Sequence, residues 1–239
     1  MTDTSFTHNT LNRRDFAFLL SLGLAKAAFG TADRSSSLDK HYLTYEKKYG
    51  VTNPDVSFPK KTFRFEEKTI TLNTERFCLV NYDLSAEKER LYILDADSNI
   101  ELSSRASHGV NTGNHTSRLF SNTEDSYQSS LGIFITGTHY VGHFGPSINL
   151  HGVSASNSKA HSRRIILHGA HYCSQAHIDT YGFLGRSLGC IALPKSKMIS
   201  AYQSLKPGTI LIAKMDVRKK MTESLIPPTS DETIENRIS

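Results

Sequence analysis

A histidine and a cysteine in two short glycine-containing motifs are the residues of this chain best suited to covalent chemistry. His168-Gly169 follows an apolar run, and Ser187 and Gly189 lie just before Cys190. A cysteine attacks as the thiolate, and a neighbouring imidazole can accept the thiol proton. Gly189 leaves space for a substrate carbonyl, and backbone N–H groups around Gly189 and Cys190 could bind the oxyanion formed on attack. The motifs therefore predict acyl transfer by Cys190 with His168 as its base.

Other residues near these motifs are candidates for substrate binding. We expect Arg186 and Ser187 to line the site with Gly169, and the planar guanidinium of Arg186 suits a carboxylate. Tyr140 is a weaker candidate for the same role. His151-Gly152 repeats the His-Gly pair but lies farther from Cys190 in the sequence, so His151 is kept as an alternative base.

The elements that must position these residues are mainly strands. A helix is predicted to begin near Pro194, since Met198, Ala201 and Leu205 share one face, and to end at Pro207-Gly208. Asp and Asn residues at 95–99 predict a turn within a hairpin. Apolar runs and alternation predict strands at 90–94, 100–102, 131–136, 147–150, 164–167 and 209–213, after a β-like stretch at 63–82.

The two ends of the chain differ from the middle. Residues 1–32 carry Arg13-Arg14, a short apolar run and small residues, which predicts a twin-arginine export signal. The apolar run at 16–25 is about half the roughly 20 residues of a spanning helix, so no stable membrane span is expected after signal removal. Residues 33–55 predict a helical lead-in segment, and residues 216–239 a flexible polar tail.

Length and charge limit the remaining possibilities. A chain of 239 residues fits one medium domain with extensions, and we place that domain at residues 56–215. The net charge of +5 comes from scattered residues without a basic stripe, so nucleic acid is not an expected partner. Cys78, Cys173 and Cys190 are an odd number, so at least one thiol stays free if disulfides are intramolecular. Cys78 and Cys173 could pair in an oxidising compartment, although two buried thiols are the simpler expectation.

The ordered motifs resemble those of murein L,D-transpeptidase catalytic domains, whose signature is His-Gly followed by Ser/Thr-x-Gly-Cys. This chain has His168-Gly169 and Ser187-Leu188-Gly189-Cys190. It departs from better-known members at two places: they have His or another residue at the position of Leu188, and an Arg shortly after the Cys, where this chain has Ile191-Ala192. The likeness covers roughly residues 78–213 and includes Ser107-His108-Gly109, Phe120-Ser121-Asn122, Ser129-Ser130-Leu131-Gly132, Tyr140-Val141-Gly142 and the stretch 157–163.

The resemblance implies a mainly β fold, an L,D-transpeptidase-type β-sandwich or mixed sheets with a few short helices. It implies that Cys190 attacks the carbonyl before the terminal D-alanine of a peptidoglycan stem tetrapeptide, and that an amine of another stem then accepts the acyl group. Water as the acceptor would make the enzyme an L,D-carboxypeptidase. An exported enzyme of this kind would work in the periplasm or cell envelope, without a cofactor.

Two other classes of protein remain as alternatives. Eleven histidines, with pairs such as His139 and His143 or His168 and His171, raise the possibility of a zinc-binding envelope protein. No His-Glu-x-x-His or Cys-x-x-Cys motif supports this alternative, and no metal is expected. A binding protein that kept the fold without catalysis is the other alternative, and the complete set of motif residues argues against it.

Overall fold

The computed structural model describes residues 62–65, 68–95 and 99–215, which form mostly strands. The predicted export signal, lead-in helix and polar tail lie outside these residues. In chain order the elements are β1 (Thr62–Phe65), β2 (Lys68–Thr71), β3 (Asn73–Asn81), β4 (Leu91–Asp95), β5 (Ile100–Ser104), β6 (Gly132–Gly142), β7 (Gly145–Gly152), the 3-10 turn η2 (Ala155–Asn157), β8 (Ile166–Ala170), the 3-10 turn η3 (His171–Cys173), α3 (Gln175–Tyr181), β9 (Ile191–Pro194), α4 (Lys195–Ser204) and β10 (Thr209–Lys214).

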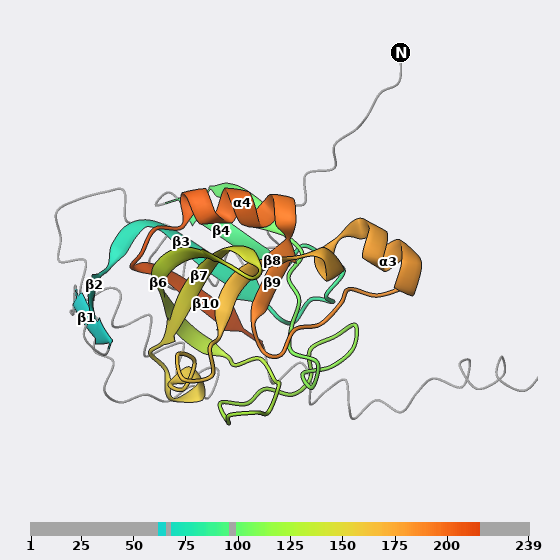
Figure 1. Cartoon of the computed structure of the whole chain (residues 1–239), viewed down its shortest axis with the longest axis horizontal. Helices are drawn as coiled ribbons and strands as arrows, with labels where there is room; N and C mark the ends of the chain where they lie inside the picture. Colours follow the sequence, from blue (N-terminus) through green and yellow to red (C-terminus); the bar gives the residue numbers. More distant parts are fainter. Residues whose placement is uncertain (1–61, 66–67, 96–98, 216–239) are drawn as a thin grey trace, which may run out of the picture.

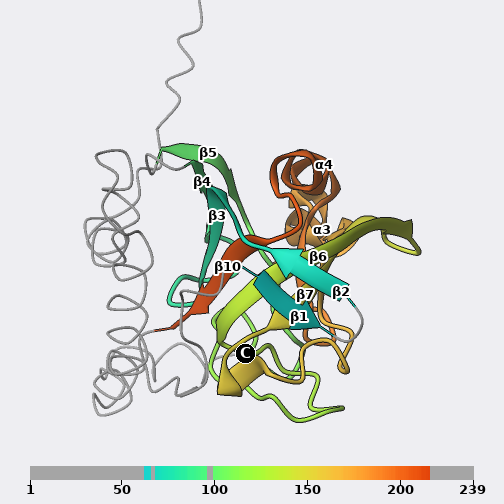
Figure 2. The same cartoon turned by 90° about the vertical axis from the view of Figure 1, so that its left-hand side faces the viewer.

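Eight of these strands form one mixed sheet in the order β5-β4-β3-β10-β6-β7-β8-β9, and β1 and β2 form a separate ribbon. The last strand, β10, lies parallel to β3 and antiparallel to β6, so it joins two parts of the sheet that are distant in sequence. Figure 1 shows α4 lying across the sheet, with the β1–β2 ribbon and α3 at opposite ends of the domain. In Figure 2 the strands β3 to β5 run steeply across β6 and β7, which shows the strong twist of the sheet.

Apolar side chains cover both faces of this sheet. Leu167, Ile191 and Ile148 belong to a buried cluster that includes Met198 and Ala201 of α4. On other strands, Phe77, Leu79, Ile133 and Ile135 pack with partly buried residues of β1 and β2. Each fully buried aliphatic or aromatic side chain contributes about 1.5–3 kcal/mol to stability, so these clusters make a rigid support for the strands that end near Cys190.

The observed elements confirm the prediction of a mainly β domain with mixed sheets and few helices. The hairpin predicted around residues 95–99 is the antiparallel pair β4–β5, and the helix predicted after Pro194 is α4. The strand predicted at 131–136 is longer, because β6 continues to Gly142 after a register shift between Thr136 and His139. No helix within the described part of the chain combines the length and apolar character needed to cross a bilayer.

Candidate active site

Strand register places Cys190 and His168 on the same face of the sheet. The strands β8 and β9 are parallel, with Leu167 opposite Ile191 and His168 opposite Ala192. Cys190 directly precedes β9, and since side chains alternate along a strand it shares a face with Ala192 and His168. The opposite face, with Leu167 and Ile191, packs toward α4. The two motifs that are separated in sequence therefore meet on neighbouring strands.

Cys190 lies at the wall of a hollow of about 650 Å³. The other two cysteines, Cys78 and Cys173, are free thiols with 0% exposure in separate apolar clusters, whereas Cys190 is partly exposed. The simpler expectation of two buried thiols thus agrees with the structure. The hollow is lined by Tyr140, His143, Phe144, Asn149, His161, Ser162, Arg164, Ile165, Ile166 and Cys190.

A tight turn that is stabilised by Ser187 holds Cys190 in place. The Ser187 hydroxyl donates to the carbonyl oxygen of Cys190 at 2.7 Å and accepts the Gly189 N–H at 3.1 Å. Gly189 has a φ of 117°, and a Cβ there would lie 3.0 Å from the Gln128 carbonyl oxygen, so glycine is required. The Gly189 N–H, a predicted oxyanion donor, thus donates to the Ser187 hydroxyl in this structure.

We expect Ser187→Ala to lower both stability and reactivity. The substitution leaves the Gly189 N–H and the Cys190 carbonyl without this buried partner, which costs about 1–3 kcal/mol of unfolding free energy. A looser turn presents the sulfur less well, so the acylation rate of Cys190 should also fall. Urea unfolding and intact-mass acylation kinetics measure the two effects, and Ser187→Thr, which keeps the hydroxyl, is the control. Acylation of Ser187→Ala at the wild-type rate would show that the turn does not depend on this hydroxyl.

His168 is a buried imidazole whose hydrogen bond defines its basic nitrogen. Its Nδ1 lies 3.1 Å from the carbonyl oxygen of Gly169, and since a carbonyl only accepts, Nδ1 carries the proton and Nε2 is the base. Burial lowers the pKa of His168, and the bond to Gly169 partly offsets this. The imidazole is therefore neutral, and able to accept a proton, near neutral pH.

The alternative base, His151, occupies a different part of the same face. It lies on β7, opposite Ile135, so β8 separates it from the strand that follows Cys190. Its ring stacks between Phe65, at 4.3 Å, and His161, at 5.0 Å. The structure thus brings His168, and not His151, onto the strand adjacent to Cys190.

The groups around the Cys190 sulfur have opposite effects on the pKa of its thiol. Burial raises the pKa of the thiol, while the backbone N–H of Ile166 and the positive charge of Arg163 lower it. The Arg163 guanidinium is held by Ser130, Ser121, Ser126 and Gln128, so it is fixed next to the site. Sequence reasoning missed Arg163 as a functional residue, because its role depends on a loop more than thirty residues away in the chain.

Arg164 follows with an unusual backbone conformation. Its φ is 53°, in the left-handed region that residues other than glycine seldom adopt. Its carbonyl oxygen accepts a hydrogen bond from the Cys190 thiol at a sulfur–oxygen distance of 3.6 Å. Such backbone strain costs about 1–3 kcal/mol and is found mostly at functional sites. In this structure the Cys190 thiol thus donates its hydrogen bond to the Arg164 carbonyl and not to the His168 imidazole.

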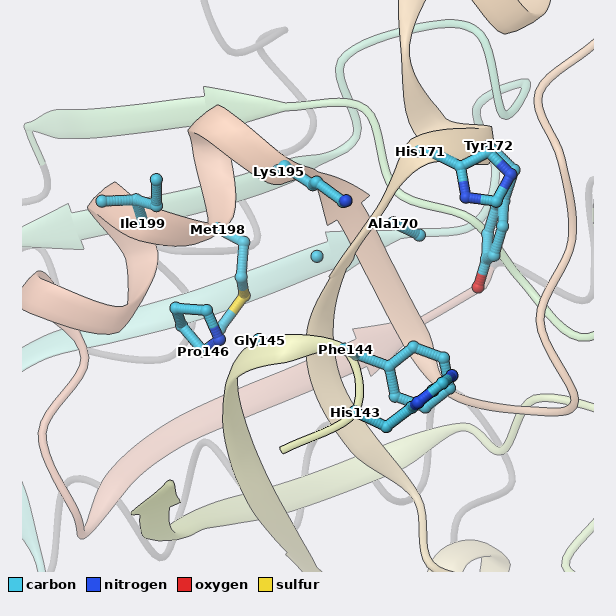
Figure 3. Close-up of a pocket in the computed structure, with 11 residues that line it drawn as sticks. His143, Phe144, Gly145, Pro146, Ala170, His171, Tyr172, Lys195, Met198 and Ile199 are labelled. Atoms are coloured by element: carbon cyan, nitrogen blue, oxygen red, sulfur yellow. The ribbon is translucent and has the colours of Figure 1, made fainter. Parts of the chain in front are cut away.

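A second hollow, of about 380 Å³, lies on the other side of Phe144. The Phe144 ring packs against the His168 ring with 4.3 Å between centroids, and Phe144 and His143 line both hollows. Figure 3 shows the Met198 side chain of α4 extending toward Pro146 of this hairpin, with Lys195 lying between Met198 and the pair His171 and Tyr172. The tip of the β6–β7 hairpin thus contributes to both hollows, while His168 itself lines neither.

The remaining predicted site residues, Tyr140, Gly169 and Arg186, lie in three different surroundings. Tyr140 lines the hollow with Cys190, and Gly169 lines the second hollow, packed against Lys195 and Met198. Arg186 instead donates to the Asn114 side chain at 2.6 Å and lies over the Phe183 ring, and it is not among the residues that line either hollow.

A buried arginine, Arg90, belongs to a hydrogen-bond network that contacts the turn of Cys190. Arg90, with 0% exposure, donates to the carbonyls of Ala106 and Leu84 and to the Ser117 hydroxyl, and its guanidinium lies 2.8 Å from Nδ1 of His108. The other nitrogen of His108 donates to the Gly113 carbonyl, so Nδ1 is the acceptor for Arg90. The backbone of His108 in turn accepts the Ser187 N–H at 2.9 Å. This network links the core to the cysteine turn.

The network predicts acid-sensitive stability. Burial, with the nearby charge of Arg90, lowers the pKa of His108 to about 4. The unfolded chain, with an ordinary pKa of about 6.5, takes up the proton first, so stability is lost as pH falls from about 6.5 to 4 and is level below that. The difference of about 2.5 pKa units corresponds to a loss of about 3 kcal/mol.

Urea unfolding over this pH range measures the loss, and the variant His108→Gln is the control. The variant cannot take up a proton at this position, so its stability should depend less on pH between 6.5 and 4. An equal pH dependence in the two proteins would show that other groups cause it.

The alternative of a zinc site has no support from side-chain grouping. Among residues 62–65, 68–95 and 99–215, no group of three or more His, Cys, Asp or Glu side chains is arranged to hold a metal ion. His139 instead uses its Nε2 to contact the Leu205 carbonyl, while His143 lies in the β6–β7 hairpin.

A partly exposed cysteine on a tight turn and a buried histidine on the adjacent strand thus lie on one face of a mixed sheet. The family model of the L,D-transpeptidase catalytic domain matches residues 56–213. The chain therefore belongs to the family of L,D-transpeptidase catalytic domains.

The solved structures that match this chain include several bacterial L,D-transpeptidases. One from Mycobacterium tuberculosis H37Rv has 13% identity and a TM-score of 0.39, over 59% of this chain and 57% of that chain. One from Mycobacterium smegmatis has 12% identity and a TM-score of 0.38, over 86% of each chain. One from Stackebrandtia nassauensis has 16% identity and a TM-score of 0.38, over 84% of this chain and 91% of that chain. This chain spans 57–61% of the length of three L,D-transpeptidase structures from Mycobacterium tuberculosis, and no curated protein sequence matches it.

Proposed function

We propose that the protein is a peptidoglycan L,D-transpeptidase that forms an acyl-enzyme on Cys190. The observation that carries the proposal is the position of Cys190, on the wall of a hollow and on the same sheet face as His168, in a chain that belongs to this family. The partner is a peptidoglycan stem peptide, and the place of action is the cell envelope. Export by a twin-arginine signal in residues 1–32 remains a prediction.

In the first step the Cys190 thiol turns from the Arg164 carbonyl and gives its proton to Nε2 of His168. The thiolate attacks the carbonyl of the third residue of a stem tetrapeptide, a carbon–sulfur bond forms, and the bond to the D-alanine nitrogen breaks. His168 returns the proton to that nitrogen, so D-alanine leaves as a neutral amine. Backbone N–H groups of Cys190 and Gly189 would hold the oxyanion, the latter by exchanging its bond to Ser187.

In the second step an amine of another stem attacks the thioester, gives a proton to His168 and takes the acyl group. The sulfur leaves as thiolate and is protonated again. Arg163 stabilises the thiolate in both steps through its positive charge. Ser187 holds the turn, and Tyr140 lines the space that the stem would occupy. Arg186 would contact a part of the substrate outside this hollow.

Mass analysis of products from a disaccharide-tetrapeptide tests this function. We expect loss of one D-alanine and formation of peptide dimers that require Cys190. Loss of D-alanine without dimers would indicate the L,D-carboxypeptidase, in which water is the acceptor. Products identical to those of a Cys190→Ala control would overturn the proposal.

A further inference from the structure

The hollow beside Cys190 contains a cation, Arg164, that has no side-chain partner among the described residues. Arg164 lines the hollow and is exposed. No side chain of the described residues forms an ion pair or hydrogen bond with its guanidinium. The neighbouring arginines differ: Arg163 is held by four hydrogen bonds, and Arg186 is bound to Asn114. Arg164 is thus the arginine of this group that is available to a ligand.

The rest of the lining favours an anionic ligand. None of the residues that line the hollow is an Asp or a Glu, and its other polar groups are histidines, a tyrosine, a serine and an asparagine. Glu124 contacts the lining from outside, where it accepts a hydrogen bond from the Ser162 hydroxyl. A guanidinium at the edge of a hollow without carboxylates binds a carboxylate in the bidentate geometry that the two planar groups share.

The backbone of Arg164 contacts the proposed nucleophile, Cys190. The left-handed conformation of Arg164 directs its carbonyl oxygen to the Cys190 sulfur, 3.6 Å away, while its side chain lines the same hollow. A carboxylate bound by Arg164 must therefore belong to a group close to the attacked carbonyl. In a stem tetrapeptide the carboxylate closest in the chain to that carbonyl is the terminal one, on the D-alanine that leaves.

We propose that Arg164 binds the terminal carboxylate of the departing D-alanine and so determines which stem peptides are donors. This assignment rests on the proposed function. The assignment gives both parts of Arg164 a role next to the nucleophile. The side chain positions the leaving D-alanine, and the backbone carbonyl accepts the hydrogen bond of the Cys190 thiol before the reaction. The same geometry predicts selection against donors whose last residue lacks a free carboxylate.

Two synthetic tetrapeptides, one ending in D-alanine and the other in D-alaninamide, test the assignment. We expect the wild-type protein to release the last residue from the first peptide with a kcat/KM about 10- to 100-fold higher. The variant Arg164→Gly removes the side chain, and glycine adopts the positive φ without strain. We expect this variant to lose the preference because its kcat/KM falls for the peptide that ends in D-alanine and stays unchanged for the amide. Arg164→Lys should restore part of it, and Lys159→Gln, which removes a cation outside the hollow, should keep it.

Affinity provides a measurement that does not depend on turnover. In the Cys190→Ala background, calorimetric binding should favour the acid over the amide, and adding Arg164→Gly should remove the difference. Preference retained in Arg164→Gly, or lost in Arg186→Gln instead, would overturn the assignment while leaving the proposed function intact. A wild-type protein that releases the last residue from neither peptide would overturn both.

Discussion

Replacement of Cys190 by alanine is expected to lower the rate of D-alanine release at least about 10³-fold and to prevent formation of a covalent adduct. Among the three cysteines, Cys190 is the one on the wall of a hollow, on the same sheet face as His168 and within reach of the charge of Arg163. Cys78 and Cys173 have 0% exposure, and burial raises the pKa of both thiols, that of Cys173 to about 12. A carbapenem, whose strained carbonyl acylates a thiolate, should therefore modify one site.

Intact-mass spectrometry after carbapenem treatment counts these adducts. The wild-type protein should gain one adduct and Cys190→Ala none. Cys173→Ala is the matched control, since it removes a buried thiol that contacts the Ala192 carbonyl and should leave the adduct unchanged. An adduct on Cys190→Ala, or its loss in a folded Cys173→Ala, would locate the nucleophile elsewhere.

Substitution of His168 by glutamine is expected to slow acylation of Cys190 by about 10²- to 10⁴-fold, the usual contribution of a general base. Glutamine fills a similar space but cannot accept the thiol proton. The variant must then rely on the thiol ionising by itself, and burial raises the pKa of that thiol. The loss should therefore be greatest near neutral pH and smaller in alkaline solution.

The pH profile separates this role from a structural one. Burial lowers the pKa of His168, and the base form is lost as pH falls through that pKa, so wild-type acylation should decline only below about pH 6.5. His168→Gln should instead show a rate that keeps rising above neutrality. His151→Gln tests the other candidate base, whose ring stacks between Phe65 and His161. A wild-type profile in His168→Gln, with a large loss in His151→Gln, would transfer the role to His151.

The local sequence was sufficient for much of the fold. Turn-forming residues around 95–99 between two apolar segments predicted the β4–β5 hairpin, and apolar spacing after Pro194 predicted α4. Helix α3 was not predicted because none of its seven residues is buried, so its sequence shows no apolar stripe. The extension of β6 to Gly142 was missed since its outer half is largely exposed and follows a register shift.

For the site, the sequence alone determined the chemical groups. These are Cys190, which follows Gly189 and lies three residues after Ser187, and the His168-Gly169 pair after an apolar run. Their types and order predicted the nucleophile and base, because that chemistry depends on which side chains are present. Only the tertiary structure decided which cations accompany them. It placed Arg163 and Arg164 near the sulfur and bound Arg186 to Asn114. The physical reason is that the parallel pairing of β8 with β9 and a left-handed φ at Arg164 are set by contacts between distant segments, which local residue patterns do not encode.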